Sequence, residues 1–300
     1  MKTRKIVLLA ACGILLCICI LQAVLKTGDT AKVFTLAKEP QQLEIICADN
    51  SYTIKMVNGV WVCGSKEYPA AESSVNGMLS AMSSIKVLDK VASSTNEANL
   101  IRYDLVDEKK ITVNALYDGK IVRTITIGKS STANTQDYIT IDNGKEVYLA
   151  SGGLRNLFSK TADEIRSKTV VTLDQNQITS ITVKEAGKEW TVSRSGSGEN
   201  LMWFISLPDS QVDGKKAGDW FNSFASVVTT VWHDTDDLDG QKLRDVEIMC
   251  GNKKVWFTLF NSKNDNQDIY YASSSETPYY FERPSYVAAK FQKNAEDLIQ

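Results

Sequence analysis

The sequence has no block of lysine and arginine beyond its first five residues, and its charges nearly cancel. The 300 residues carry 34 Lys and Arg against 36 Asp and Glu, a formal net charge of −2. A protein that binds nucleic acid needs a basic patch to neutralise phosphates. The composition therefore argues against a nucleic-acid-binding function.

Histidine is almost absent: His233 is the only one in the chain. A multi-histidine metal site is thereby excluded, and a Ser-His-Asp arrangement would have to use His233 as its base. The sequence also lacks the Gly-x-Ser-x-Gly motif of many serine hydrolases. We interpret His233 as a loop residue that follows a predicted helix, rather than as a catalytic group.

The six cysteines include no Cys-x-x-Cys pair, which argues against zinc and thioredoxin-like sites. Three of them lie in an apolar segment near the N-terminus: Cys12, Cys17 and Cys19. The others are Cys47, Cys63 and Cys250. Two interpretations stay open for these three: a disulfide between Cys47 and Cys63, on predicted neighbouring strands, or free thiols throughout.

One glycine-bearing stretch and one acidic stretch resemble ligand-binding loops but lack residues that such loops need. Residues 195–200, Ser-Gly-Ser-Gly-Glu-Asn, lack the lysine of a phosphate-binding loop and lie between predicted strands. Residues 234–240 fail the EF-hand pattern because Leu238 stands at the fifth position. We interpret the first stretch as a hairpin loop, and we prefer a solvated turn to a weak calcium site for the second.

Paired carboxylates give no better signal for catalysis. Asp107-Glu108 and Asp236-Asp237 are adjacent in sequence, so their side chains would point to opposite faces of a strand. We therefore predict no catalytic residue, no cofactor, no metal site and no enzymatic activity.

Among the features that are present, the first is an apolar run at positions 6–25. Its 20 residues contain no charge and one amide, Gln22. As a helix the run would be about 30 Å long, enough to cross the hydrocarbon core of a bilayer. Lys2, Arg4 and Lys5 precede it. The positive-inside bias then predicts a single-pass anchor with its N-terminus in the cytoplasm and residues 26–300 outside the membrane.

Two alternatives to this anchor stay open. A cleaved signal peptide usually has a shorter apolar run, and no Ala-x-Ala site follows this one. The sequence Leu9-Ala10-Ala11-Cys12 resembles a lipobox, in which Cys12 would be lipidated. We prefer the transmembrane anchor because a mature protein beginning at Cys12 would keep a second apolar segment.

One pattern of tryptophan and apolar spacing occurs twice. Trp61 and Trp203 are each followed by apolar residues at matching positions, which predict one face of an amphipathic helix about four turns long. The matched positions are Val75, Met78, Leu79, Met82 and Ile85 in the first copy, and Ala217, Trp220, Phe221, Phe224 and Val227 in the second. The pattern indicates an internal duplication.

Alternating apolar residues and turn signals such as Asp142-Asn143-Gly144 complete each copy. Each repeat then reads as a three-stranded meander, a helix, a four-stranded meander and a closing helix. We predict an α+β fold in which antiparallel sheets carry one or two packed helices each. The predicted organisation is an anchor at 1–25, a linker at 26–39, repeat 1 at 40–168 and repeat 2 at 169–300.

Aromatic residues concentrate in the second repeat. We interpret most of them as a bulkier core. Adjacent tyrosines on a strand point to opposite faces, so one of each pair faces outward. The outward members of these pairs are our candidate partner surface: Tyr270, Tyr271, Tyr279 and Tyr280.

The chain resembles a bacterial family described as domain of unknown function 4340. The resemblance spans residues 40–297 and rests on motifs in a fixed order. These are the N-terminal apolar segment, the block around Trp61, a turn at Ile127-Gly128-Lys129, the stretch from Tyr138 to Tyr148, and Glu164–Val170 leading to Ile178, Ile181 and Val183. The resemblance implies a membrane-anchored extracytoplasmic protein that accompanies ABC-type transporters. It carries no catalytic residues over to this chain.

These observations favour an accessory or scaffold protein of the cell envelope, serving an ABC-type transporter. Two other hypotheses stay open. One is an envelope binding module for a lipid, glycan or peptide held near the repeat-2 aromatic residues. The other is a hydrolase whose polar cluster the sequence does not reveal.

Overall fold

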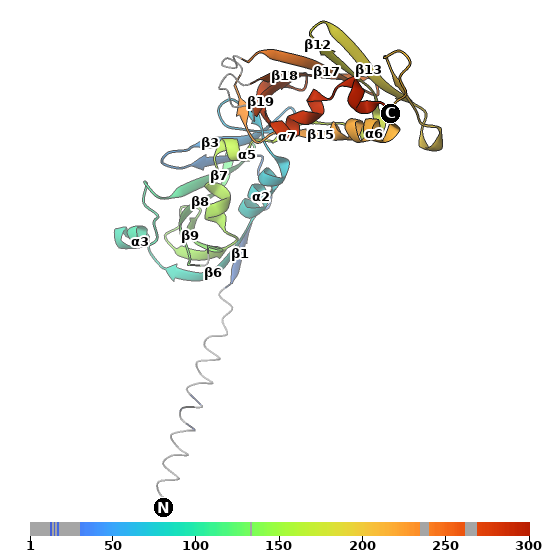
Figure 1. Cartoon of the computed structure of the whole chain (residues 1–300). Helices are drawn as coiled ribbons and strands as arrows, with labels where there is room; N and C mark the ends of the chain where they lie inside the picture. The colour runs from blue at the N-terminus through green and yellow to red at the C-terminus, as the bar shows by residue number, and fades with distance from the viewer. Residues whose placement is uncertain are drawn as a thin grey trace, which may run out of the picture. The chain divides into compact units, whose positions relative to one another are not determined.

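A computed structural model of the chain describes residues 31–132, 134–234, 240–261 and 269–300, together with Gly13, Leu15 and Cys17, which are helical. The chain forms two compact units, residues 1–167 and 168–300 (Figure 1). The strands pair antiparallel and the helices are few and short. The predicted α+β class with antiparallel sheets is therefore confirmed.

In unit 1, ten strands form one sheet in the order β1-β6-β10-β9-β8-β7-β2-β3-β4-β5. Alternating side chains explain its central strands: Ile111, Val113 and Ala115 are buried, and the polar residues between them face the other side. The bounds are β1 Lys32–Thr35, β2 Gln42–Ile46, β3 Tyr52–Val57, β4 Val60–Cys63, β5 Tyr68–Pro69, β6 Ser84–Ala92, β7 Ile111–Tyr117, β8 Lys120–Ser130, β9 Gln136–Ile141 and β10 Val147–Ser151.

Helices cover one face of this sheet. They are α2 Glu72–Ser83, α4 Leu154–Phe158 and α5 Ala162–Ile165. The apolar stripe of α2 is fully buried, and with Phe158 and Ile165 it forms one core against the inward side chains of the strands. Each large apolar side chain buried in this way contributes about 1.5–3 kcal/mol.

The opposite face of the same sheet is covered at one end by α3 Glu97–Arg102. A small separate cluster forms there, in which Tyr103 and Leu105 pack with Val147 and Tyr138. The approach is close at Gly128, because a Cβ at that position would lie 2.0 Å from the Tyr103 carbonyl oxygen. Gly128 therefore permits the segment after α3 to lie directly on β8.

Unit 2 contains an eight-stranded sheet in the order β14-β13-β12-β17-β18-β19-β20-β16, and a two-stranded sheet of β11 and β15. The bounds are β11 Thr169–Thr172, β12 Ile178–Glu185, β13 Lys188–Ser195, β14 Met202–Ile205, β15 Ser226–Val228, β16 Trp232–His233, β17 Lys242–Cys250, β18 Lys253–Asn261, β19 Ile269–Ser274 and β20 Thr277–Pro284.

The core of unit 2 is rich in aromatic residues. Helices α6 Gly214–Ser223 and α7 Ser285–Ala288 lie on the same side of strands β17 and β18 (Figure 1). Trp220, Phe221 and Phe224 pack there against Phe257 and Phe291, with ring centroids 5.3–6.3 Å apart in several edge-to-face or tilted pairs. Four short 3₁₀ turns complete the described helical structure of this unit: η1 Gln175–Gln177, η2 Gly198–Asn200, η3 Ala289–Gln292 and η4 Ala295–Leu298.

The two sheets have the same strand order. From β4 to β6 in unit 1 the order is β4-β3-β2-β7-β8-β9-β10-β6, and β14-β13-β12-β17-β18-β19-β20-β16 follows it strand for strand. β1 pairs with the first half of β6, and β11 pairs with β15, which precedes β16. In unit 1 helix α2 follows strands β2 to β5 and precedes β6, and in unit 2 helix α6 follows strands β12 to β14 and precedes β15.

Several elements differ from the sequence-based expectations. The expected linker 26–39 contains β1, which pairs with β6. The two repeat helices end at Ser83 and Ser223, so Ile85 and Val227 belong to strands. Gly128 lies within β8 rather than in a turn. The closing helix of unit 1 is divided into α4 and α5, because Ser159, Lys160 and Thr161 interrupt it and Thr161 caps α5 with a capping box.

The predicted anchor at 6–25 lies outside the described residues, apart from Gly13, Leu15 and Cys17. Within the described part of the chain, no helix has the length and apolar character needed to cross a membrane. Cys12, the candidate lipidation site, is also outside it.

Cys47, Cys63 and Cys250 are free thiols. The expectation that Cys47 and Cys63 are on neighbouring strands was wrong: Cys63 is in β4 and Cys47 follows β2, with β3 between these strands. Burial raises the pKa of the Cys63 thiol to about 11.

Candidate functional site

The unit 2 sheet has one face that no helix of the described chain covers, which we call the outer face. Strand alternation defines it: Val255, Phe257 and Leu259 of β18 are buried in the core, so the residues between them point the other way. Following the register across the sheet, the outer face carries Thr182, Lys184, Glu189, Thr191, Met202, Phe204, Asp245, Glu247, Trp256, Thr258, Phe260, Tyr271, Ser273, Tyr280, Glu282 and His233.

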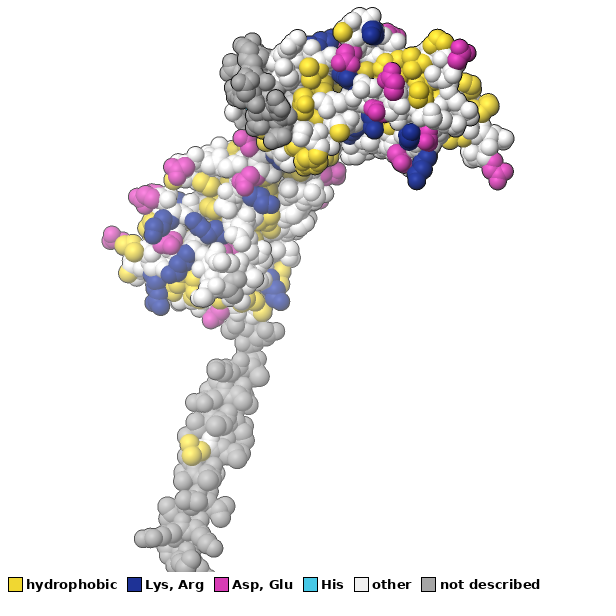
Figure 2. Space-filling model, in the orientation of Figure 1, with side chains coloured by type: hydrophobic (Ala, Val, Ile, Leu, Met, Phe, Trp, Pro, Cys, Tyr) yellow, Lys and Arg dark blue, Asp and Glu magenta, His cyan; other side chains and the backbone are white. Residues whose placement is uncertain are grey.

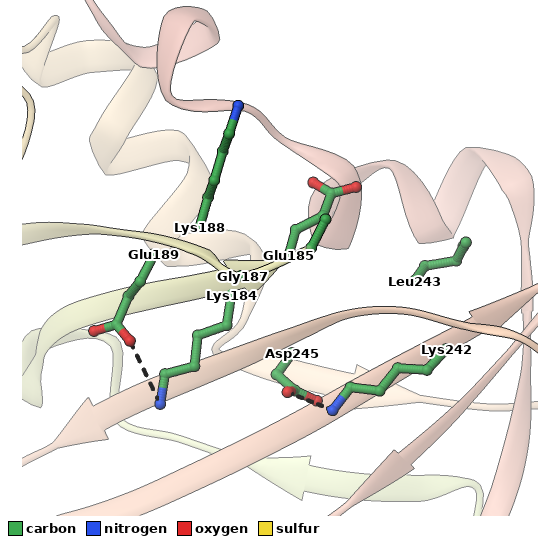
Figure 3. Close-up of a pocket in the computed structure, with 9 residues that line it drawn as sticks. Lys184, Glu185, Gly187, Lys188, Glu189, Lys242, Leu243 and Asp245 are labelled. Carbon is green, nitrogen blue, oxygen red and sulfur yellow. Dashed lines mark ion pairs between the residues drawn. The ribbon is translucent and has the colours of Figure 1, made fainter.

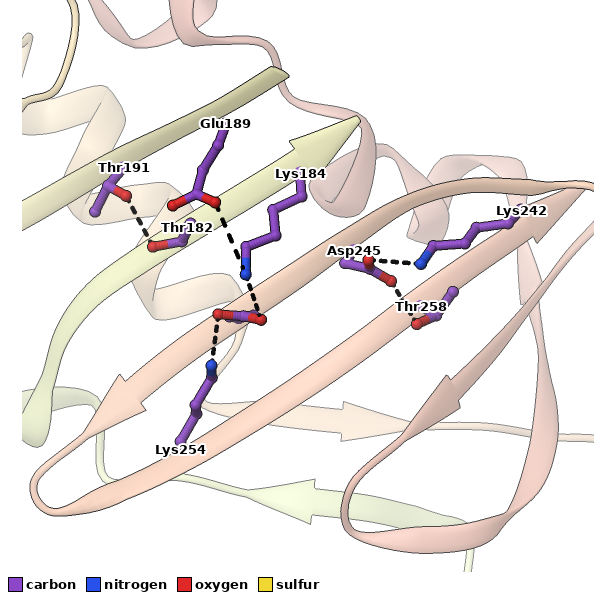
Figure 4. A network of polar contacts seen from close by, with 9 residues as sticks. Thr182, Lys184, Glu189, Thr191, Lys242, Asp245, Lys254 and Thr258 are labelled. Atoms are coloured by element: carbon purple, nitrogen blue, oxygen red, sulfur yellow. Dashed lines mark hydrogen bonds and ion pairs between the residues drawn. The ribbon is translucent and has the colours of Figure 1, made fainter. Parts of the chain in front are cut away.

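The middle of the outer face is a network of ion pairs and hydrogen bonds (Figure 4). The Glu247 carboxylate lies 2.8 Å from Lys184 Nζ and 2.7 Å from Lys254 Nζ. Asp245 lies 2.7 Å from Lys242 Nζ and accepts a 2.6 Å hydrogen bond from the Thr258 hydroxyl. Each carboxylate of the network therefore has a lysine partner.

This network does not poise a carboxyl group for proton transfer. The hydrogen bond from Lys184, followed by that from Lys254, holds the pKa of Glu247 below its ordinary value. The same hydrogen bond, which Lys184 donates to Glu247, in turn raises the pKa of Lys184. A general acid at neutral pH would need the opposite shift at the carboxyl. The arrangement is suited to holding the side chains of the outer face in place, rather than to acid–base catalysis.

A hollow of about 370 Å³ lies at the end of the β12–β13 hairpin, beside this network (Figure 3). Lys184 and Glu189 point to one side of the hairpin, while Glu185 and Lys188 point to the other (Figure 3). Glu185 pairs with the buried Arg244 at 2.6 Å, so its carboxylate is also occupied. Apart from Lys188, the charged side chains that line the hollow have ion-pair partners.

An aromatic cluster occupies the outer face over β16, β19 and β20. His233 Nε2 and Glu282 Oε1 are 2.8 Å apart, and the His233 ring meets the Tyr271 ring edge-on with centroids 5.1 Å apart. Tyr280 lies beside Phe260, with centroids 5.7 Å apart. His233 was predicted to be a loop residue, but it lies in β16 opposite Tyr280.

The four tyrosines of the predicted partner surface divide between the two faces. Tyr271 and Tyr280 are on the outer face, as the register with Phe260 and His233 requires. Tyr270 packs against the core, and Tyr279 lies near Trp232 on the inner side, with ring centroids 6.3 Å apart. All four are partly exposed.

Unit 1 presents different chemistry at the corresponding strands. There the residues on the face opposite the core are small and polar, for example Thr124, Thr126 and Thr140, and Thr124 and Thr140 are buried. Its outward Tyr138 is packed under Tyr103, with ring centroids 4.7 Å apart, in the segment that follows α3. The exposed aromatic residues are thus a property of unit 2.

A second feature of unit 2 is a half-buried lysine at the C-terminus of α6. Lys290 Nζ donates a 2.5 Å hydrogen bond to the carbonyl oxygen of Ser223, the last residue of α6, and lies over the Phe224 and Phe291 rings. Burial, reinforced by the charge of Arg283, lowers the pKa of Lys290 to about 8. Lys290 lines an open hollow of about 490 Å³. A cation at the negative end of a helix is a stabilising arrangement, so we interpret it as a cap.

The other predicted or rejected sites have the following positions. Residues 195–200 join β13 to β14 as the expected hairpin loop. The acidic stretch considered for calcium lies outside the described residues from 235 to 239. Among the residues that the structure describes, no three His, Cys, Asp or Glu side chains are grouped so that they could hold a metal ion.

The model of one protein family, described as domain of unknown function (DUF4340), matches residues 61–246, more than half of the chain. The chain belongs to this family. The predicted family is thereby confirmed. No curated protein and no solved structure matches the chain. The DUF4340 match begins in β4 and ends in β17, so it draws on both units.

Sequence reasoning missed the exposed position of Trp256. It was grouped with the core aromatic residues, but it lies on the outer face and is 40% exposed. The alternation of Val255, Phe257 and Leu259 around it was the available signal, since a strand buries every second residue.

Proposed function

We propose that this DUF4340 protein is a membrane-anchored, extracytoplasmic accessory protein without enzymatic activity. Residues 6–25 hold it in the membrane with the N-terminus in the cytoplasm, and a lipid on Cys12 is the alternative anchor. The partner implied by the family resemblance is an ABC-type transporter. The observation that carries the proposal is the aromatic part of the outer face, where Tyr271 and Tyr280 are partly exposed beside His233.

We further propose that the two units arose by duplication of one α+β unit. The shared strand order, with a helix at the same place in each, supports this. After duplication, one copy can keep the scaffold while the other acquires binding residues. The aromatic residues on the outer face of unit 2, set against threonines in unit 1, agree with that division.

The partner surface can be tested by co-purification. Full-length protein with a C-terminal tag would be isolated from its native membrane in mild detergent, as the wild type and as the double variant Tyr271→Ser/Tyr280→Ser. Because aromatic side chains at the centre of an interface carry much of the binding energy, we expect the variant to recover at least about tenfold less of a stoichiometric membrane-protein partner.

The matched control is Tyr286→Ser, which changes a tyrosine that is 82% exposed on α7, away from the outer face. It should recover the partner as the wild type does. Equal recovery by the double variant, or no stoichiometric partner for the wild type, would count against the proposal. The mass of the N-terminal peptide from the same preparation distinguishes the transmembrane anchor from a lipid on Cys12.

A further inference from the structure

We propose that the outer face of unit 2 carries a carbohydrate-binding site, centred on Trp256. The site is an open hollow of about 580 Å³. Its lining combines two aromatic rings with hydroxyl groups and one carboxylate: Trp256, Tyr280, Ser273, Ser275, Thr277 and Glu276. This inference goes beyond the accessory function proposed above and does not depend on a protein partner.

The two rings stand on strands that flank a third. Trp256 is on β18, Tyr280 is on β20, and Ser273 is on β19 between them, all on the outer face. Strands two places apart are separated by about 10 Å. That separation suits two sugar rings of an extended oligosaccharide that have one further ring between them, each laid against an aromatic side chain, with the Ser273 hydroxyl beneath the middle ring.

Trp256 is available to a ligand. Its side chain is 40% exposed, and neither its indole nitrogen nor the Tyr280 hydroxyl has a hydrogen-bond partner within the described residues. Aromatic faces pack against the apolar faces of other rings, while free donors at their edges bind polar groups. A sugar ring offers both kinds of surface at once.

The turn between β19 and β20, which lines the hollow, is held in place by contacts within the protein. The Ser275 hydroxyl accepts a 3.2 Å hydrogen bond from the Trp256 backbone N–H, and the Ser275 N–H donates a 3.1 Å hydrogen bond to the Trp256 carbonyl. Glu276 is fixed by an ion pair with Lys253. Preorganisation of this kind reduces the entropy lost on binding.

The composition of the hollow disfavours other ligand classes. No arginine lines it, and its one carboxylate would repel a phosphate or an acidic lipid headgroup. β18 and β19 are internal strands with neighbours on both sides, so they offer no free edge to an extended peptide. Hydroxyls between two aromatic rings fit a neutral oligosaccharide best.

The test is calorimetric titration of the full-length protein in a detergent without a sugar headgroup. The ligands are soluble hexasaccharides of β-1,4-linked glucose, β-1,4-linked N-acetylglucosamine and α-1,4-linked glucose. We expect saturable binding of at least one of them. Trp256→Ala should weaken it by at least about tenfold, Tyr280→Ala should weaken it less, and Trp256→Tyr should restore much of it.

Phe204→Ala is the matched control, because Phe204 is 49% exposed on the same face at the β14 edge, away from the hollow. It should bind as the wild type does, and circular dichroism should show every variant folded. Absence of saturable binding by the folded wild type would overturn the proposal, as would unchanged binding by folded Trp256→Ala. Co-purification of a protein partner is a separate measurement, so either proposal can fail while the other stands.

Discussion

Two cationic side chains of unit 2, Arg283 and Lys290, lie near the same aromatic ring. Arg283 is 2% exposed, and its guanidinium carbon is 5.7 Å from the centroid of Phe291. Lys290 Nζ is 5.5 Å from the same ring. Burial lowers both pKa values, that of Arg283 to about 10 and that of Lys290 to about 8. Holding these charges therefore costs stability that other contacts must offset.

The lowered pKa of Lys290 predicts an unusual rise of stability with pH. Below about pH 8 the lysine is charged in both the folded and unfolded states, and the burial penalty is present in full. Between about 8 and the ordinary pKa of 10.5, the folded state has lost the proton while the unfolded state keeps it, so stability increases. After a discount for solvent screening, we expect a gain on the order of 1 kcal/mol.

The comparison of the wild type with Lys290→Met isolates this effect from other titrating groups. Urea unfolding of unit 2, followed by tryptophan fluorescence from pH 7 to pH 10.5, should show the gain in the wild type and not in the variant. A difference between the two proteins that stays constant over this range would contradict the assignment.

Among the elements, the repeat helices show what local spacing can and cannot predict. The apolar positions Val75, Met78, Leu79 and Met82 were correctly assigned to the buried stripe of α2. The end of the helix was misplaced because Ile85, which continues the helical spacing, is also the inward residue of β6. No Gly or Pro marks the change, so only pairing with β1 and β10 decides it.

Two glycines in unit 1 should respond in opposite ways to the same substitution. Gly128→Ala would place a Cβ 2.0 Å from the Tyr103 carbonyl and force the segment after α3 away from β8, at a cost of about 1–3 kcal/mol. Gly77→Ala, in α2 with no atom within 4 Å of the added Cβ, should stabilise the protein by about 0.5–1 kcal/mol.

Hydrogen exchange measured by mass spectrometry separates a local from a global effect. In Gly128→Ala, amides of residues 97–105 should exchange faster while the core strands keep their protection. If these amides exchange as in the wild type, Gly128 does not set the docking of α3.

At the scale of the whole molecule, each unit has its own core. Phe158 is fully buried in unit 1, and Phe224 is fully buried in unit 2. Truncation of a buried phenylalanine to alanine costs about 3–5 kcal/mol. Differential scanning calorimetry should therefore show Phe158→Ala and Phe224→Ala each lowering a different unfolding transition. A single transition that both variants lower equally would mean that the units unfold together.

The architecture was more predictable than the candidate site. Alternation and turn signals such as Asp142-Asn143-Gly144 depend on neighbouring residues, and the strands of both meanders followed from them. The contact of His233 with Glu282 depends on the pairing of β16 with β20, which joins residues about fifty positions apart. Only the folded sheet brings them together.

The shared strand order has a practical consequence for where the chain can be cut. The family match begins at Trp61 and ends at Val246, but β2 and β3 come before it, and β18, β19 and β20 come after it. A recombinant fragment with those limits would separate β4 from β7 in one sheet and leave β17 without its neighbour β18 in the other. The segment that matches the family model is therefore not a folding unit by itself, and expression trials should keep residues 31–300 intact.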